Sequence, residues 1–173
     1  GLGRIGTLPK DMTFGELAGI INGEKWLANG IQCDVTVIKC KNYTHASMYT
    51  LPVKPSPNLP DMRSIYLYPS TCYFEATPVS LGRGTEHPFQ MYGHPNMKGY
   101  DYKFTPRSVP GAKTPPQLNR ECYGVDLTKE PSIEEINKKG INLEYVIDAY
   151  RNLNLDDFFF RSFFELLTGR DYI

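Results

Sequence analysis

Prolines divide this chain more sharply than any other feature of its sequence. Four of them fall within residues 52–60. Each proline removes a backbone donor and restricts the residue before it, so a helix or an internal strand cannot pass through this segment. We therefore expect residues 41–60 to form a loop, and a loop of this length in a compact domain is usually functional. The sequence predicts one part at residues 1–60 and a second part at residues 61–173.

The first part carries one helix–strand unit. Thr13 and Glu16 have the spacing of a capping box, and apolar residues follow at helical spacing as far as Gly23. The β-branched alternation of residues 33–38 predicts a strand. A single unit of this kind cannot bury both faces of a parallel sheet. We therefore expect it to be the last unit of a larger α/β domain whose other strands lie upstream.

The second part mixes strands with helices, which is an α+β pattern. Residues 100–104 and 121–128 have strand composition. Residues 62–74 fit either a strand or a helix entered at Pro69, because proline suits the first turn of a helix. We expect three further helices, at residues 132–139, 141–150 and 156–167, the last with Asp156 and Asp157 in its first turn and Gly169 after its end.

Composition excludes several classes of protein. The 173 residues carry 19 basic and 19 acidic side chains, so no net basic charge points to nucleic acid. Hydrophobic content of 40% is typical of a folded chain, and no apolar run is long enough to span a bilayer. The sequence begins at Gly1 without a signal-peptide pattern, and we expect a piece of a longer protein.

The cysteines and histidines predict neither a metal site nor a bound cofactor. None of the four cysteines forms a CxxC pair, and the histidines are not spaced as zinc ligands around them. Cys33 and Cys40 lie at opposite ends of the predicted strand, too far apart to pair. We expect buried free thiols at all four positions, with disulfides in an oxidising compartment as the alternative.

Residues 68–95 hold most of the groups that can do chemistry. Glu75 lies among aromatic and small residues, which would remove it from water and raise its pKa. Arg83 stands between two glycines, and its planar fork suits a carboxylate or a phosphate. The alternative for Arg83 is a solvated side chain on a surface loop, and for Glu75 a carboxylate that binds backbone N–H groups. Glu86 is expected to stay ionised.

These segments resemble the bacterial exo-β-N-acetylmuramidase family. The match begins at residues 55–60 (PSPNLP) and continues with Tyr68-Pro69, Thr71-Cys72, Phe74-Glu75, Thr77, Ser80, Gly82-Arg83-Gly84-Thr85, Pro88-Phe89, Gly93 and Pro95. Two positions depart from the family pattern: Ala76 where glycine is usual, and Pro78 where many members have asparagine.

The resemblance implies a fold, an activity and a location. It implies the end of a Rossmann-like domain in residues 1–60, and a C-terminal subdomain with a small sheet and helices in residues 61–173. The implied activity is hydrolysis of terminal N-acetylmuramic acid from the non-reducing end of peptidoglycan glycans, in a periplasmic or secreted protein. A non-catalytic cell-wall or sugar-binding module of the same fold is the alternative, kept open by Ala76 and Pro78.

The resemblance also implies site residues. The family's favoured catalytic glutamate lies in the upstream N-terminal domain, so this chain is expected to be inactive alone, with Glu75 as its own candidate catalytic or sugar-binding carboxyl. Arg83 is expected to bind the lactyl carboxylate of N-acetylmuramic acid, with Tyr73, Phe89 and Tyr92 under the sugar ring. The remaining candidate substrate-binding residues are Asn58, Gly84, Thr85 and His94. We also expect residues 49–60 to pack against residues 82–85 and form one wall of a cleft.

Overall fold

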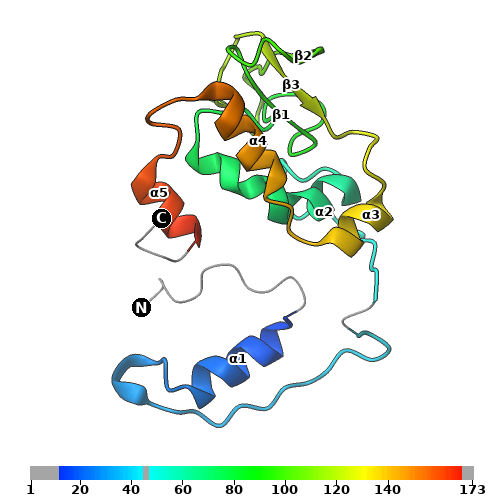
Figure 1. The fold of residues 1–173 in the computed structure, drawn as a ribbon. Helices are drawn as coiled ribbons and strands as arrows, with labels where there is room; N and C mark the ends of the chain where they lie inside the picture. Colours follow the sequence, from blue (N-terminus) through cyan, green and yellow to red (C-terminus); the bar gives the residue numbers. More distant parts are fainter. Residues whose placement is uncertain (1–11, 45–46, 169–173) are drawn as a thin grey trace. The chain divides into compact units, whose positions relative to one another are not determined.

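The computed structural model describes residues 12–44 and 47–168 (Figure 1). The chain divides into two compact units, Gly1–Tyr49 with Glu165–Ile173, and Thr50–Phe164. The residues predicted to bind or act on a ligand lie in the second unit. No helix in the part of the chain that the structure describes is long and apolar enough to cross a membrane.

The first unit contains helix α1 (Phe14–Gly23) and a short 3-10 turn, η2 (Ala28–Gly30). The predicted capping box is confirmed: the Thr13 hydroxyl accepts from the Glu16 N–H, and the Glu16 carboxylate accepts from the Thr13 N–H at 2.8 Å. The Asn22 side chain then holds Cys33, accepting from its N–H at 2.7 Å and donating to its carbonyl at 2.9 Å.

The predicted strand at residues 33–38 is wrong for this structure. No described segment forms a ladder with it, and Val35, Val37 and Ile38 are exposed. A strand is defined by hydrogen bonds to a neighbour, so β-branched alternation without a partner strand leaves only an extended segment.

The second unit begins with helix α2 (Met62–Thr71), which continues into the 3-10 helix η3 (Cys72–Ala76). The helix interpretation of residues 62–74 is therefore confirmed, but Pro69 does not lie in the first turn. The Asp61 carboxylate accepts from the Ser64 N–H at 2.8 Å and starts the helix there. Pro69 lies near the end, and the tighter turn that follows carries Glu75.

Three further helices follow, and two begin later than their composition predicts. They are α3 (Ile133–Lys139), capped by Ser132 as expected, α4 (Glu144–Leu153) and α5 (Arg161–Thr168). The Asn142 side chain accepts from the Glu144 N–H and sets the start of α4. Residues 156–160 are not helical, because Phe158 enters the core and the Phe160 N–H bonds the Ala76 carbonyl at 2.8 Å. Asp156 and Asp157 are thus outside α5, and Gly169 lies outside the described residues.

A three-stranded antiparallel sheet completes the unit as an α+β fold. Its strands are β1 (Met91–His94), β2 (Tyr102–Phe104) and β3 (Cys122–Asp126), in the order β1-β3-β2. The two predicted strands are confirmed as β2 and β3, which pair with each other, and β1 was not predicted. Ser80 bonds Gly93 on the outer side of β1, and β2 forms the other edge with Lys103 exposed.

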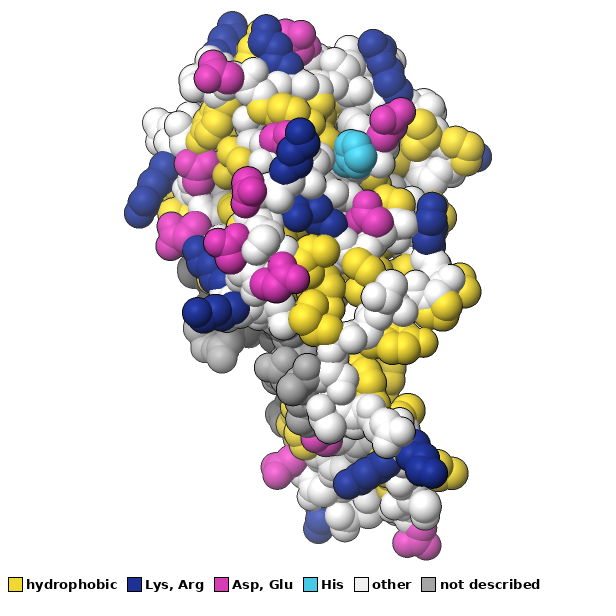
Figure 2. All heavy atoms as spheres, turned by 90° about the vertical axis from the view of Figure 1, so that its right-hand side faces the viewer, with side chains coloured by type: hydrophobic (Ala, Val, Ile, Leu, Met, Phe, Trp, Pro, Cys, Tyr) yellow, Lys and Arg dark blue, Asp and Glu magenta, His cyan; other side chains and the backbone are white. Residues whose placement is uncertain are grey.

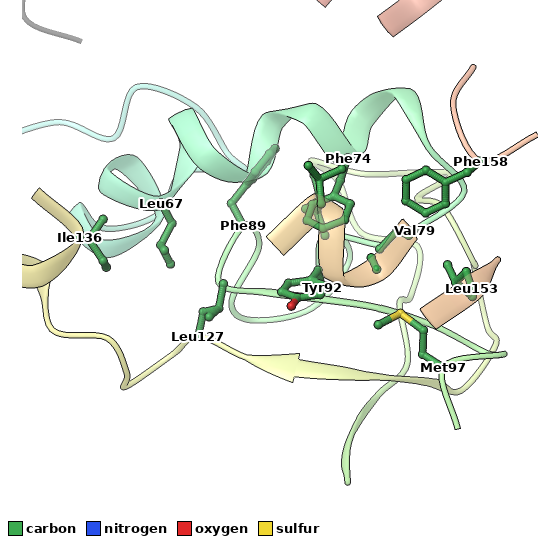
Figure 3. Close-up of a cluster of buried hydrophobic side chains, with 13 residues drawn as sticks. Leu67, Phe74, Val79, Phe89, Tyr92, Met97, Leu127, Ile136, Leu153 and Phe158 are labelled. Atoms are coloured by element: carbon green, nitrogen blue, oxygen red, sulfur yellow. The ribbon is translucent and has the colours of Figure 1, made fainter. Parts of the chain in front are cut away.

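The core lies between the helices and this sheet (Figure 3). The rings of Phe74 from η3 and Tyr92 from β1 stack with centroids 4.9 Å apart, and Tyr92 contacts Tyr145 of α4. The core therefore fixes η3, which carries Glu75, against β1. Its buried members are Leu67, Phe74, Val79, Leu81, Phe89, Tyr92, Met97, Leu127, Ile136, Val146, Ala149, Leu153 and Phe158.

One carboxylate organises the polar edge of this core. The same oxygen of Asp148 accepts from the hydroxyls of Tyr92 at 2.8 Å and Tyr100 at 2.7 Å. The Asn152 amide donates to the other oxygen at 3.0 Å. Burial, followed by the hydrogen bond to Asp148, raises the pKa of both tyrosines. Asp148 thus ties α4 to β1 and to the segment before β2.

We expect Asp148→Asn to lower the free energy of unfolding by about 1.5 kcal/mol, because an amide supplies one acceptor where the carboxylate supplies two. Urea unfolding followed by circular dichroism measures the change. Asp101→Asn, at an exposed position, is the matched control and should change stability by less than about 0.5 kcal/mol. Equal stability of Asp148→Asn and the control would show that the network contributes nothing.

Candidate functional site

Arg83 lies at the tip of a tight turn. Gly82 and Gly84 have positive φ values of 70° and 85°, a conformation that side chains with a Cβ rarely adopt. The Thr85 N–H and hydroxyl both donate to the Gly82 carbonyl, at 3.0 and 2.7 Å. The backbone of the turn is thus closed on itself, and Arg83 extends from it.

The neighbouring glycines pack closely against protein atoms on the side where a Cβ would lie. The Gly84 carbonyl accepts from the Arg107 N–H at 2.9 Å, and a Cβ on Gly84 would meet the Arg107 carbonyl. A Cβ on Gly82 would lie 2.6 Å from Cγ of Met91. In this structure Gly84 and Thr85 build the turn, and their contact with the substrate stays a prediction.

Arg83 faces Glu75. Its Nη1 lies 3.5 Å from Oε1 of Glu75, and the two side chains are 35% and 23% exposed. The Nε atom of Arg83 is shielded from water and has no hydrogen-bond partner among the described residues. The structure thus brings together the two charged groups that the sequence singled out, in a partly desolvated position.

Two further side chains join this pair. Burial raises the pKa of Glu75, and the charge of Arg83 opposes the rise. Burial and then the Glu75 charge raise the pKa of the Cys72 thiol to about 11. The pKa of Tyr68 is raised by burial, then by Glu75 and Cys72, while Arg83 lowers it. Tyr68, Cys72, Glu75 and Arg83 therefore form one electrostatic cluster.

The sequence prediction missed Tyr68 and Cys72 as members of this cluster. Tyr68, Cys72 and Glu75 are spaced by four and three residues, which is the spacing of one helix face. The helix interpretation of residues 62–74 began the helix at Pro69, so the face that includes Tyr68 was not recognised. A helix running from Met62 to Ala76 would have revealed it.

Phe89 and Tyr92 belong to the core, which corrects their expected place under a sugar ring. They are 3% and 2% exposed. Phe89 packs on the ring of Tyr68, centroid to centroid 5.2 Å, and Tyr92 donates its hydroxyl to Asp148. Tyr73 is half-buried and its ring lies 6.3 Å from that of Phe164. Tyr68 is partly exposed and couples electrostatically to both members of the charged pair.

His94 is buried at the end of β1. Its Nδ1 accepts from the Asn96 N–H at 3.1 Å, so this nitrogen is unprotonated and Nε2 carries the hydrogen of the neutral ring. Burial, and then the charge of Arg120, lower the pKa of His94. Its observed role is to hold the turn after β1.

Asn58 contacts the connector at residues 105–116. Its amide donates to the Gly111 carbonyl at 3.0 Å, and a Cβ on Gly111 would lie 2.9 Å from Pro57. The same connector meets Gly84 through Arg107. Residues 55–60 and 82–85 therefore share a neighbour, and their direct packing into one cleft wall stays a prediction.

The two departures from the family pattern are both accommodated. Ala76 is 0% exposed, its φ is not positive, and its carbonyl accepts from Phe160. The Pro78 carbonyl accepts from the Gln117 amide at 2.7 Å. Neither residue therefore disturbs the backbone beside Glu75.

A shallow pocket of about 250 Å³ lies along the proline-rich segment. Its walls are mostly apolar, and its one carboxylate belongs to Asp61. The oxygens of that carboxylate already accept from Ser64 and from the Gln90 amide. The Asp61 carboxylate in this pocket thus already serves the start of α2 and Gln90.

The cysteines are free thiols in the described part of the chain, but only Cys72 and Cys122 are buried. Burial raises the pKa of Cys122 to about 12. Cys33 and Cys40 are exposed, which corrects the expectation of buried thiols there, because the segment between them is not packed as a strand. Within residues 12–44 and 47–168 no three His, Cys, Asp or Glu side chains gather in a way that would hold a metal ion.

Comparison with known families matches almost the whole chain. The family described as "Exo-beta-N-acetylmuramidase NamZ, C-terminal" matches residues 66–173, which include Tyr68, Glu75 and Arg83. Its N-terminal counterpart matches residues 6–63. The chain belongs to the exo-β-N-acetylmuramidase NamZ family. The predicted division at residue 60 stays a prediction, since the structural units divide after Tyr49 and the family matches meet after residue 63.

Individual NamZ-family relatives are longer than this chain. The Bacillus subtilis (strain 168) protein named "Peptidoglycan beta-N-acetylmuramidase NamZ" is 35% identical, over 96% of this chain and 43% of its own length. A crystal structure of a DUF1343 family protein from Bacteroides fragilis is 70% identical with a TM-score of 0.86, over 93% of this chain and 45% of that one. A second DUF1343 structure from the same species is 20% identical with a TM-score of 0.62, over 91% and 46%. The chain spans less than half the length of these relatives, and the second structure supports the fold alone.

Proposed function

We propose that this chain is the C-terminal part of an exo-β-N-acetylmuramidase that removes terminal N-acetylmuramic acid from the non-reducing end of peptidoglycan glycans. The Bacillus subtilis relative, a peptidoglycan β-N-acetylmuramidase by name, supports the substrate class. A Rossmann-like N-terminal domain and a periplasmic or secreted location belong to the same proposal. They rest on the family resemblance.

The observation that carries the proposal is the loose Arg83–Glu75 pair in a motif shared with the family. N-acetylmuramic acid differs from N-acetylglucosamine by a lactyl ether that ends in a carboxylate. A guanidinium with unsatisfied donors at the edge of solvent is suited to bind that group. Tyr68, half-exposed beside the pair, supplies an apolar face for the sugar.

Glycoside hydrolysis generally needs two carboxyl groups at the scissile bond. Glu75 is the carboxyl that this chain places beside Arg83, and its raised pKa is compatible with an acid. The proposal places the principal catalytic glutamate in the N-terminal domain. The alternative is a non-catalytic sugar-binding module of the same fold, since the fit of Ala76 and Pro78 to the backbone does not report on hydrolysis.

A chromogenic substrate tests the proposal directly. The intact protein is incubated with 4-nitrophenyl N-acetyl-β-muramide and, as the control, with the corresponding N-acetylglucosaminide. We expect release of nitrophenol from the muramide only. Binding of the muramide without release would favour the sugar-binding module, and release from the glucosaminide alone would overturn the proposed specificity.

A further inference from the structure

Arg83 makes few of the interactions that an arginine can make. A guanidinium has five N–H donors, and no described residue accepts a hydrogen bond from it; Glu75 is near enough only for an ion pair. One donor, at Nε, is also shielded from water. A shielded donor without a partner costs about 1–3 kcal/mol. A position of Arg83 in which Nε had a hydrogen-bond acceptor would therefore be more favourable.

The contact with Glu75 holds Arg83 only weakly. At 3.5 Å it is longer than a charge-assisted hydrogen bond, which measures about 2.7–2.9 Å. Both side chains are partly exposed, and ion pairs of this kind contribute little to stability. Glu75 therefore balances the charge of Arg83 without fixing the guanidinium by hydrogen bonds.

We infer that Glu75 is a positioning residue that balances Arg83 in the free protein and is replaced there by the ligand's carboxylate. This inference rests on the proposed function, because it assumes a carboxylate sugar as the ligand. The exchange gives Arg83 a partner that can reach two of its donors at once. It leaves the Glu75 carboxylate without its counter-charge and next to a second anion.

Among the described residues, Arg83 is the one positive charge that shifts the pKa of Glu75. The titratable groups that couple to it are Tyr68 from α2, Cys72 from η3 and Arg83 from the turn. Tyr68 and Cys72 are neutral near pH 7, because the pKa of each is raised. Once Arg83 turns to the ligand, Glu75 is expected to take up a proton.

The sign of the resulting pH dependence follows from linkage. Glu75 has a higher pKa in the complex than in the free protein, so binding takes up a proton. Affinity therefore rises as the pH falls through the range between the two pKa values, both above the ordinary glutamate value. When one proton is taken up on binding, affinity can rise by at most about tenfold for each pH unit of decrease. The ligand's carboxylate stays ionised above about pH 5, so its own titration does not interfere.

The test is the dissociation constant of the intact protein for N-acetylmuramic acid and for N-acetylglucosamine, measured by calorimetry from pH 5 to pH 8. We expect wild type to bind N-acetylmuramic acid more tightly at lower pH and to bind N-acetylglucosamine equally across the range. Glu75→Gln should bind N-acetylmuramic acid about tenfold more tightly than wild type at pH 8 and lose the pH dependence. Glu75→Asp keeps the charge and should keep the dependence.

A second acidic variant serves as the matched control. Glu86 is exposed and three residues from Arg83 along the chain, and Glu86→Gln should leave the pH dependence unchanged. Equal pH profiles for wild type and Glu75→Gln would overturn the inference while leaving the proposed function intact. Loss of N-acetylmuramic acid binding in folded Glu75→Gln would also overturn it, because Glu75 would then contact the ligand. Failure of wild type to prefer N-acetylmuramic acid would instead contradict the proposed function.

Discussion

Replacing Arg83 by alanine is expected to abolish the preference of the intact protein for N-acetylmuramic acid over N-acetylglucosamine. A charge-assisted hydrogen-bonded pair in a partly desolvated site contributes about 2 kcal/mol, which corresponds to about 30-fold in affinity. Only N-acetylmuramic acid carries the carboxylate, so its binding alone should weaken. Dissociation constants for both sugars, in wild type and Arg83→Ala, measure the effect.

Arg83→Lys separates charge from geometry. Lysine keeps the positive charge but lacks the planar fork, so an intermediate loss is expected, between wild type and Arg83→Ala. If Arg83→Ala weakened both sugars equally, Arg83 would serve to hold the loop and would not read the carboxylate. Thermal unfolding of each variant checks that the fold is retained.

Gly84→Ala is expected to lower the free energy of unfolding by about 4 kcal/mol. Two effects add at this position. The φ of 85° is unfavourable for any residue with a Cβ. The new methyl group would also meet the Arg107 carbonyl, with the Arg107 nitrogen at 3.0 Å and Cγ of Pro115 at 2.9 Å. Two of these three atoms belong to backbone and cannot turn away as a side chain can.

Gly99→Ala is the matched control for this substitution. No atom lies within 4 Å of a Cβ built at Gly99, and its φ is not positive. Its stability should stay within about 0.5 kcal/mol of wild type in urea unfolding of the intact protein. A small effect of Gly84→Ala would mean that residues 105–116 move aside readily, and that the turn under Arg83 is not fixed by close packing.

Local signals in the sequence predicted the starts of α1 and α3. The capping boxes at Thr13 and Ser132 each need only their own first turn. The start of α5 depended on a contact far along the chain, between Phe160 and Ala76. Apolar periodicity gave no sign of that hydrogen bond.

Two strand predictions, at residues 100–104 and 121–128, are confirmed, whereas the strand at residues 33–38 was wrong and β1 was missed. Residues 33–38 have strand composition but no partner in the described part of the chain, whereas Met91–His94 has only four residues and pairs with β3. Strand formation is decided by the neighbouring strand, which composition does not report. The pairing of β1 with β3 also places the Tyr92 side chain in the core, where its hydroxyl donates to Asp148.

The motif located the charged pair of the candidate site but not its surroundings. Glu75 and Arg83 stood out by residue type and by glycine flanks, and the structure places them within 3.5 Å. Their spacing of eight residues carries no such information, because the chain turns through Ala76 and Gly82 in between. The place of Tyr68 in the cluster depends on α2 continuing into η3, which the sequence did not predict.

The two outer edges of the small sheet differ in what hinders another strand from pairing with them. On β1, the Gly93 N–H and carbonyl are already bonded to Ser80, at 2.9 and 2.8 Å. On β2, three residues are available, and the middle one is Lys103, which is 53% exposed and pairs with Glu121. An incoming strand would have to cover an ammonium group to gain a very short ladder. The sheet is therefore poorly suited to edge-to-edge association, and the protein should resist aggregation by this route at high concentration.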